Sequence, residues 1–179
     1  VFARQFGTAV NTPPTVDLDA NNSSGATGNT YLFTFTEGDA AIAIADTDTD
    51  LVDADSPTFA SVTLAVSGLL DGNAETLVLD GDTFALATAV AGQNTTGGNY
   101  HVVITTGAGT AALTITKQGG GTFSEIETET LIEAIQYRHT DTSAPTNGDR
   151  LIDVTVYDGA LDSTAARTTI NVNPMNDAP

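Results

Sequence analysis

The sequence predicts an all-β domain, a sandwich of antiparallel sheets, and three observations lead to that fold class. Apolar and polar residues alternate with a period of two in many short stretches. Clusters of Gly, Asn and Asp separate these stretches, as reversing turns require. Hydrophobic residues make up 40% of the 179 residues, which is enough for one large domain or two small ones. The same alternation also fits a barrel, and the sandwich is the preferred interpretation.

The expected strands follow one another at short spacing. In chain order they are 31–36, 41–45, 59–67, 75–80, 83–90, 100–106, 112–117, 134–140, 150–158 and 165–172. The pattern is clearest near the C-terminus, where Ile152, Val154 and Val156 should face the core and the residues between them the opposite side. The segments between 80 and 122 are expected to form hairpin insertions.

One short helix is predicted at about 124–133. Ser124 can serve as the N-cap, and Glu127 completes a capping box three residues later. Glu125 and Glu127 place negative charge in the first turn, which suits the helix dipole. We expect two or three turns that cross from one sheet to the other.

Charge and composition limit the function classes. Lys and Arg total 5 against 23 Asp and Glu, and the net charge of −18 argues against nucleic acid or an anionic membrane surface as partner. The chain has no cysteine and no run of about 18 apolar residues, so neither disulfides nor membrane insertion is expected. The low lysine content and abundant Thr, Asp, Ala and Gly are typical of secreted bacterial surface proteins. We therefore expect an extracellular segment cut from a longer chain.

An acidic run between two predicted strands carries the strongest chemical signal. Its carboxylates, with no Lys or Arg among them, are Asp46, Asp48, Asp50, Asp53 and Asp55. If the backbone is extended through the first three, their side chains share one face, and they repel unless a cation binds. Ca²⁺, which takes six to eight oxygen ligands, is the expected cofactor, although the spacing is not that of an EF-hand. The alternative is a solvated acidic turn.

The two ends of the chain have different interpretations. Residues 1–10 are expected to be a strand remnant or a segment that pairs with a neighbouring sheet edge, which would permit filament assembly. Residues 11–18 begin with a stretch stiffened by Pro13 and Pro14 that leads into the first strand. We expect one domain over 11–172 and a linker over 173–179.

The C-terminal third carries a family resemblance. The stretches AIQYRHT (134–140), APTNGDRLIDVTVYDGA (144–160) and TINVNPMNDAP (169–179) resemble the cadherin-like tandem repeats of large bacterial surface and adhesin proteins. They are also similar to repeats of the chondroitin-sulfate-proteoglycan type. The resemblance implies an Ig/cadherin-like β-sandwich cut from linker to linker, with neighbouring repeats or identical subunits as partners.

The resemblance also implies calcium ligands at the domain ends. The matching residues are Glu37, Asp53, Asp55, Asp149, Asn176 and Asp177. Two positions depart from the cadherin pattern, since Asn173 replaces the leading acid of the linker and Leu151 a second acid after Arg150. Glu37 and the linker ligands are expected at the C-terminal end and the Asp53–Asp55 pair at the other, so that a single repeat carries half-sites.

Other chemistry has little support in the sequence. His101 and His139 are expected to be exposed strand residues, because neither lies in a zinc motif. The sequence has no nucleotide-binding or hydrolase fingerprint, and we expect no enzymatic activity.

Two functions of different class follow from these patterns. The first is a calcium-rigidified structural repeat of a secreted adhesin or extracellular matrix protein, acting in cell adhesion or biofilm. The second is a polysaccharide- or surface-binding module, for which four tyrosines offer a platform. These are Tyr31, Tyr100, Tyr137 and Tyr157. Core packing is the competing explanation for these rings.

Overall fold

The computed structural model describes residues 10–175, and strands predominate in them. The strands of the larger sheet are β2 (Tyr31–Thr36), β6 (Ser61–Ser67), β9 (Val90–Asn94), β10 (Tyr100–Gly107), β11 (Thr110–Lys117), β14 (Gly148–Tyr157) and β15 (Ala166–Asn173). Those of the smaller sheet are β3 (Ile42–Ala43), β7 (Glu75–Leu79), β8 (Asp82–Ala85) and β13 (Gln136–His139). Two ribbons pair β1 (Thr15–Asp17) with β4 (Asp50–Val52) and β5 (Thr58–Phe59) with β12 (Phe123–Ser124). The helices are η1 (Gly72–Ala74) and α1 (Glu125–Ala134).

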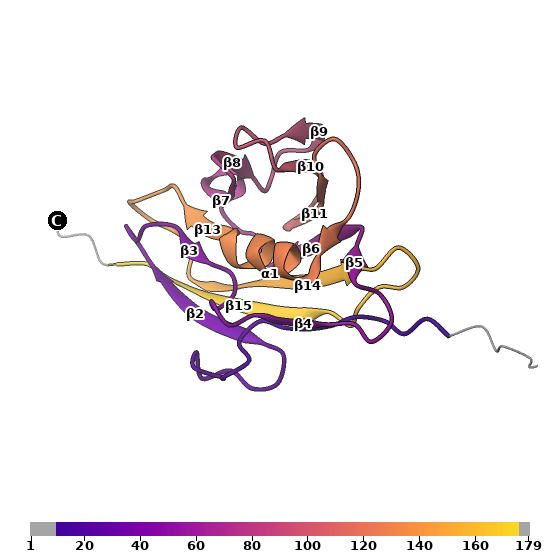
Figure 1. Cartoon of the computed structure of the whole chain (residues 1–179). Helices are drawn as coiled ribbons and strands as arrows, with labels where there is room; N and C mark the ends of the chain where they lie inside the picture. Colours follow the sequence, from indigo (N-terminus) through magenta and orange to yellow (C-terminus); the bar gives the residue numbers. More distant parts are fainter. Residues whose placement is uncertain (1–9, 176–179) are drawn as a thin grey trace, which may run out of the picture.

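The predicted all-β sandwich fold is confirmed. The larger sheet has the order β2-β15-β14-β6-β11-β10-β9 and the smaller one the order β3-β13-β7-β8. Pairing is antiparallel throughout both sheets except between β15 and β2, which run parallel. The larger sheet curves around the smaller sheet and α1 (Figure 1). The two ends of the described chain are far apart, because the chain enters at one end of the domain and leaves at the opposite end (Figure 1).

The core follows the period-two pattern. In β14, Ile152, Val154 and Val156 are fully buried, as predicted, and they lie beside the buried apolar residues of β6. The ring of Phe35 in β2 meets that of Tyr137 in β13 edge to face, with centroids 5.5 Å apart, so that the two sheets are joined by an aromatic pair.

The capping box also forms as predicted. The side chain of Ser124 accepts a hydrogen bond from the Glu127 N–H (3.3 Å), and the Glu127 carboxylate accepts one from the Ser124 N–H (2.8 Å). The helix then packs its buried residues Leu131 and Ile132 against the core. It connects the short ribbon strand β12 to β13 of the smaller sheet.

Several predicted strands are shorter than expected or divided: the stretch 134–140 is a strand only over β13, and 59–67 divides into β5 and β6. The stretch 83–90 divides into β8 and β9, because the chain turns at 86–89, where the Thr88 N–H donates to the Ala85 carbonyl (3.1 Å). Leu86 is nevertheless fully buried, so the apolar pattern continues through the turn. The stretch 41–45 pairs only at Ile42–Ala43. Within the described residues, no helix is long and apolar enough to cross a membrane.

Candidate metal centre

The acidic run does not form the extended ribbon considered in the sequence analysis. The chain turns after Asp46, whose carbonyl accepts the Thr49 N–H (3.3 Å) and the Thr49 hydroxyl (2.9 Å). Asp50 begins β4 opposite Asp17 of β1 and is exposed. The condition for a shared face of Asp46, Asp48 and Asp50 is therefore not met, because Asp48 lies inside this turn and Asp50 in the strand that follows it.

Asp19, just after β1, organises the loop that meets this turn. Its Oδ1 accepts the N–H of Ser23 (2.8 Å) and its Oδ2 that of Ser24 (2.9 Å). The residue is fully buried. The Asp46 N–H donates to the carbonyl of Leu18 (2.9 Å), which joins the two loops through the backbone.

Three carboxylates meet where these loops touch. Asp19, Asp46 and Asp48 each present an oxygen, and these oxygens lie within 4.8 Å of one another. The Ser23 hydroxyl donates to Asp46 Oδ2 (2.6 Å), and the Asn21 N–H donates to Asp48 Oδ2 (2.9 Å). Asp48 Oδ1 is buried and accepts no hydrogen bond from the described residues. Because a buried carboxylate oxygen without a donor is costly, this atom is suited to a cation.

Hydrogen bonds favour the ionised form of two of these groups. Desolvation acts to raise the pKa of Asp19, but hydrogen bonds from Ser24 and Ser23 outweigh it and lower that pKa. The Ser23 hydroxyl and the Thr47 N–H lower the pKa of Asp46 against desolvation and the charge of Asp19. Two carboxylates about 5 Å apart repel by about 3 kcal/mol at an effective dielectric near 20. A hard divalent cation would convert this repulsion into binding.

Helix α1 adds negative charge behind the acidic turn. Glu129 Oε1 accepts the Leu51 N–H (3.0 Å). Desolvation raises the pKa of Glu133, and the charge of Glu129 adds to this, as do those of Asp46 and Asp48. Among residues 10–175, none of these acids forms an ion pair with a basic side chain. Within the part of the chain that the structure describes, the negative field at this turn has no counter-charge.

The predicted pair Asp53 and Asp55 does not join this cluster. Asp55 Oδ1 accepts the Thr12 N–H (3.0 Å) and the Thr12 hydroxyl, so the pair lies where the chain enters the domain. Asp53 Oδ1 accepts the N–H groups of Asp55 (3.0 Å) and Ser56 (3.1 Å), while its Oδ2 is buried without a donor from residues 10–175. Thr12 lowers the pKa of Asp55 against desolvation and the nearby charge of Asp158.

Two of the other predicted end ligands, Glu37 and Asp149, lie near the exit of the chain. Glu37 is buried, and its Oε2 accepts the Met175 N–H (2.9 Å). Asp149 is exposed near the start of β14. Asn176 and Asp177 lie outside the described residues. Of the predicted ligands that the structure describes, only Asp46 and Asp48 lie in the three-carboxylate cluster.

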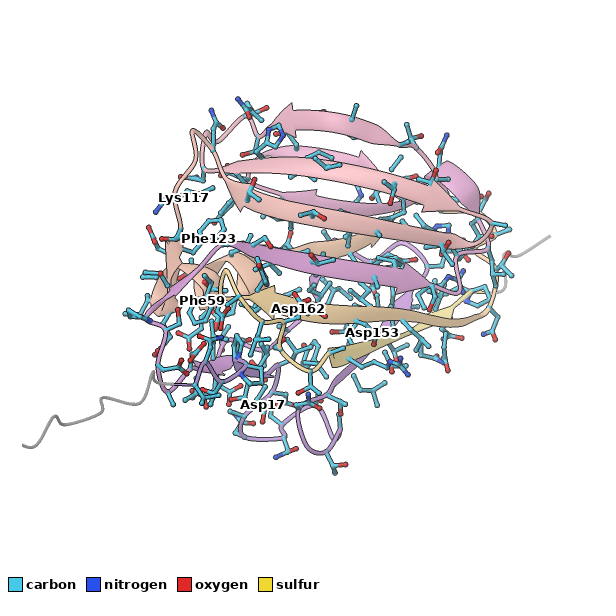
Figure 2. All side chains as sticks on the ribbon, turned by 90° about the vertical axis from the view of Figure 1, so that its right-hand side faces the viewer. Asp17, Phe59, Lys117, Phe123, Asp153 and Asp162 are labelled. Atoms are coloured by element: carbon cyan, nitrogen blue, oxygen red, sulfur yellow. The ribbon has the colours of Figure 1, made fainter. Side chains whose placement is uncertain are left out.

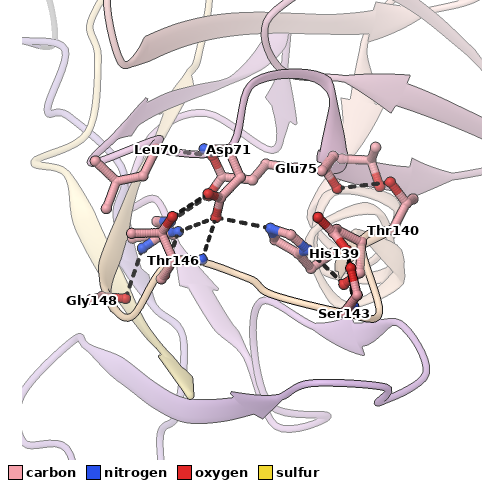
Figure 3. Close-up of polar contacts among 12 residues, drawn as sticks. Leu70, Asp71, Glu75, His139, Thr140, Ser143, Thr146 and Gly148 are labelled. Atoms are coloured by element: carbon pink, nitrogen blue, oxygen red, sulfur yellow. Dashed lines mark hydrogen bonds and ion pairs between the residues drawn. The ribbon is translucent and has the colours of Figure 1, made fainter. Parts of the chain in front are cut away.

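A second cluster, formed by Asp71, Glu75 and His139, has spacing that suits a metal but already contains a cation (Figure 3). Arg150 is fully buried, and its Nη2 lies 2.9 Å from Asp71 Oδ2 while its Nε donates to Glu75 Oε1. The Thr146 N–H also donates to Asp71 Oδ2 (2.9 Å). We interpret this cluster as an ion-pair network that holds the fold together.

One histidine differs from the prediction. His139 is buried at 3% exposure, with its Nε2 3.0 Å from Asp71 Oδ2 and its Nδ1 3.1 Å from the Asp141 carbonyl. The expectation that it is exposed is wrong, because β13 directs it into the ion-pair network. His101 is half-buried, and its Nδ1 lies 2.8 Å from Asn94 Oδ1.

The tyrosines do not form an exposed platform. Tyr137 is fully buried and donates its hydroxyl to Glu75 Oε1 (3.3 Å). Tyr157 donates its hydroxyl to the carbonyl two residues later in its own turn. Tyr31 packs beside Phe33, with ring centroids 5.9 Å apart. Tyr100 is the tyrosine that lines a surface hollow.

Sequence reasoning missed Asp19 and Arg150. The signal for Asp19 was local, because an acid followed by Ser23, Ser24 and Gly25 is typical of a side chain that caps a loop. The signal for Arg150 was its place in the period-two pattern of β14, two residues before the buried Ile152.

The chain matches no family model, no curated protein and no solved structure. The role of the acidic cluster is therefore inferred from its geometry and charge.

Proposed function

We propose that this domain is a calcium-binding structural repeat of a secreted bacterial adhesin or extracellular matrix protein, and that Ca²⁺ binds at Asp19, Asp46 and Asp48. It would act in cell adhesion or biofilm as a rigid spacer without enzymatic activity. Its partners would be neighbouring repeats or identical subunits.

The observation that carries this proposal is the oxygen of Asp48 that is buried without a hydrogen-bond donor. Asp48 is one of three residues that each present a carboxylate oxygen within 4.8 Å of the others, and no basic side chain among residues 10–175 pairs with it. Carboxylate oxygens are the ligands that Ca²⁺ prefers, and backbone carbonyls or water can complete a shell of six to eight. The net charge of −18 adds long-range attraction for cations.

The arrangement of the ends supports the spacer role. The chain enters and leaves at opposite ends of the domain (Figure 1). Asp55 contacts the entering segment at Thr12, Asp53 accepts the Asp55 N–H beside it, and Glu37 contacts the leaving segment at Met175. These acids would form half-sites that a neighbouring repeat completes, separate from the cluster within the domain.

Thermal unfolding with excess Ca²⁺, with Mg²⁺ and with EGTA tests the proposal. At a hundredfold excess over the dissociation constant, binding to the folded state adds about 2.7 kcal/mol. For a domain of this size, that corresponds to a rise of about 5–10 °C in Tm. Calorimetric titration of the same sample would give the stoichiometry.

Two matched variants locate the ion. Asp48→Asn keeps the side-chain shape but removes the charge, and it should abolish most of the Ca²⁺-dependent rise in Tm. Asp50→Asn makes the same change two residues away on an exposed side chain and should keep the rise. An unchanged calcium response in Asp48→Asn would contradict this assignment. A response lost only in Asp53→Asn would move the site to the entry end.

A further inference from the structure

A surface hollow opens where the start of β10 and the end of β11 meet the first turns of α1. It has a volume of about 190 Å³. Its apolar wall is formed by Tyr100, Phe123 and Ile126, and its polar wall includes Lys117, Glu127 and Thr130. A volume of this size holds about six waters at roughly 30 Å³ each and lies below the usual range for drug-sized ligands. The hollow therefore suits a single ring.

The aromatic residues form a corner. The rings of Tyr100 and Phe123 have centroids 6.1 Å apart and an interplanar angle of 49°. Phe123 is buried behind the corner, whereas Ile126 is 73% exposed at its rim. Lys117 and Phe123 lie next to each other at one side of the domain (Figure 2), with Nζ 5.9 Å from the ring centroid. A ligand ring would find apolar surface on two sides.

The polar wall is fixed in place and carries no net charge. Lys117 Nζ lies 2.7 Å from Glu127 Oε1, and the Ser124 N–H holds Glu127 Oε2 at 2.8 Å. Lys117 also donates to the Thr122 carbonyl (3.4 Å), which leaves one of its three N–H groups available. Because Glu127 neutralises Lys117 in a protein of charge −18, an anionic ligand gains nothing here.

We propose that this hollow binds one neutral pyranose ring of a polysaccharide. The C–H face of the ring packs on Tyr100, and its hydroxyls bond to Lys117, Glu127 and Thr130. An aromatic peptide side chain fits less well, because it would leave the lysine N–H and the threonine hydroxyl without partners. This site is separate from the proposed calcium cluster and does not depend on it.

An NMR titration in EGTA tests the proposal. The probes are glucose, galactose, mannose and N-acetylglucosamine, with maltotriose and cellotriose as short polymers. For at least one probe we expect shifts of the Tyr100, Lys117 and Ile126 amides, with a Kd on the order of 1 mM or below. Tighter binding of a trisaccharide than of its monosaccharide identifies a polymer as the source of the ring.

Two variants and one competing probe can overturn it. Tyr100→Leu should weaken binding at least tenfold, and Ile126→Ser, which changes an exposed residue and leaves the core intact, should weaken it severalfold. Leu161→Ser, which changes an exposed leucine outside the hollow, should leave the Kd unchanged. The site is refuted if no sugar shifts these amides at a concentration 50-fold above a Kd of ~1 mM. It is also refuted if Ile126→Ser binds as tightly as the unaltered chain. Shifts with N-acetylphenylalanine amide alone would assign it to a peptide instead.

Discussion

Replacing Arg150 by Met should destabilise the domain more than any other single loss of positive charge. Arg150 and Glu75 are both fully buried, so the variant leaves the Glu75 carboxylate without its counter-charge. Glu75 would keep the N–H groups of Leu70 (2.8 Å) and Asp71 (2.9 Å) as donors, but Asp71 would also lose the Nη2 contact. Breaking a buried pair typically costs about 3–5 kcal/mol. This corresponds to a fall in Tm of about 6–20 °C, measured by thermal unfolding in EGTA.

Arg167→Met is the matched control. Arg167 Nε and Nη2 donate to the two oxygens of Asp153 at 2.7 and 2.8 Å, so the geometry is equally good. The side chains are 50% and 30% exposed, however, and such a pair contributes less than about 1 kcal/mol. Equal losses of stability in both variants would refute the reasoning. If Arg150→Met does not fold, adding Glu75→Gln should restore part of the stability by removing one unpaired charge.

The remaining predictions concern the acidic turn and α1. Glu133→Gln should raise the stability of the calcium-free domain by about 0.2–0.5 kcal/mol, because it removes repulsion from Glu129. It should also weaken Ca²⁺ binding, measured by the calorimetric titration proposed above. A lower stability of the calcium-free variant would contradict this prediction. Folding lowers the pKa of Asp19 and of Asp46, so their ionised forms stabilise the folded state at pH values above the unfolded pKa of 3.8. This stabilisation should be lost as the pH falls through the folded pKa values. Urea unfolding at a series of acidic pH values would show the loss. Ser124→Ala should cost about 1 kcal/mol and lower Tm by about 2–4 °C, since it removes the N-cap acceptor; an unchanged Tm would mean that the cap does not stabilise the helix.

Features formed by residues close together in the sequence could be predicted, whereas those formed by distant residues could not. The capping box lies within four residues, and α1 begins at Glu125, one residue from the predicted start. The inward face of β14 followed from alternation alone, but alternation also continued through the turn after β8, since Leu86 is buried there. That turn was therefore missed.

The candidate site was harder to predict because its parts come from distant segments. Asp19 meets Asp46 only because the backbone of Asp46 bonds to Leu18, a contact that no local pattern encodes. Composition drew attention to the acidic run, yet it gave no way to separate Asp48 in the turn from Asp50 in the following strand. Folding assigns these neighbours to different surroundings, one partly buried and one exposed.

The contrast between the two clusters strengthens the case for an external cation. The chain has 5 basic residues, of which Lys117, Arg138, Arg150 and Arg167 lie in the part that the structure describes. Arg150 neutralises one cluster from within, while Arg167 and Lys117 pair with acids at the surface, and Arg138 is exposed. None of these residues reaches the cluster at Asp19, which has a comparable density of carboxylates and an oxygen without a donor. Where the basic residues within 10–175 supply no positive charge, a cation from solution would make burial of these carboxylates favourable. Stability of this part of the domain should therefore depend on the calcium concentration of the surrounding solution.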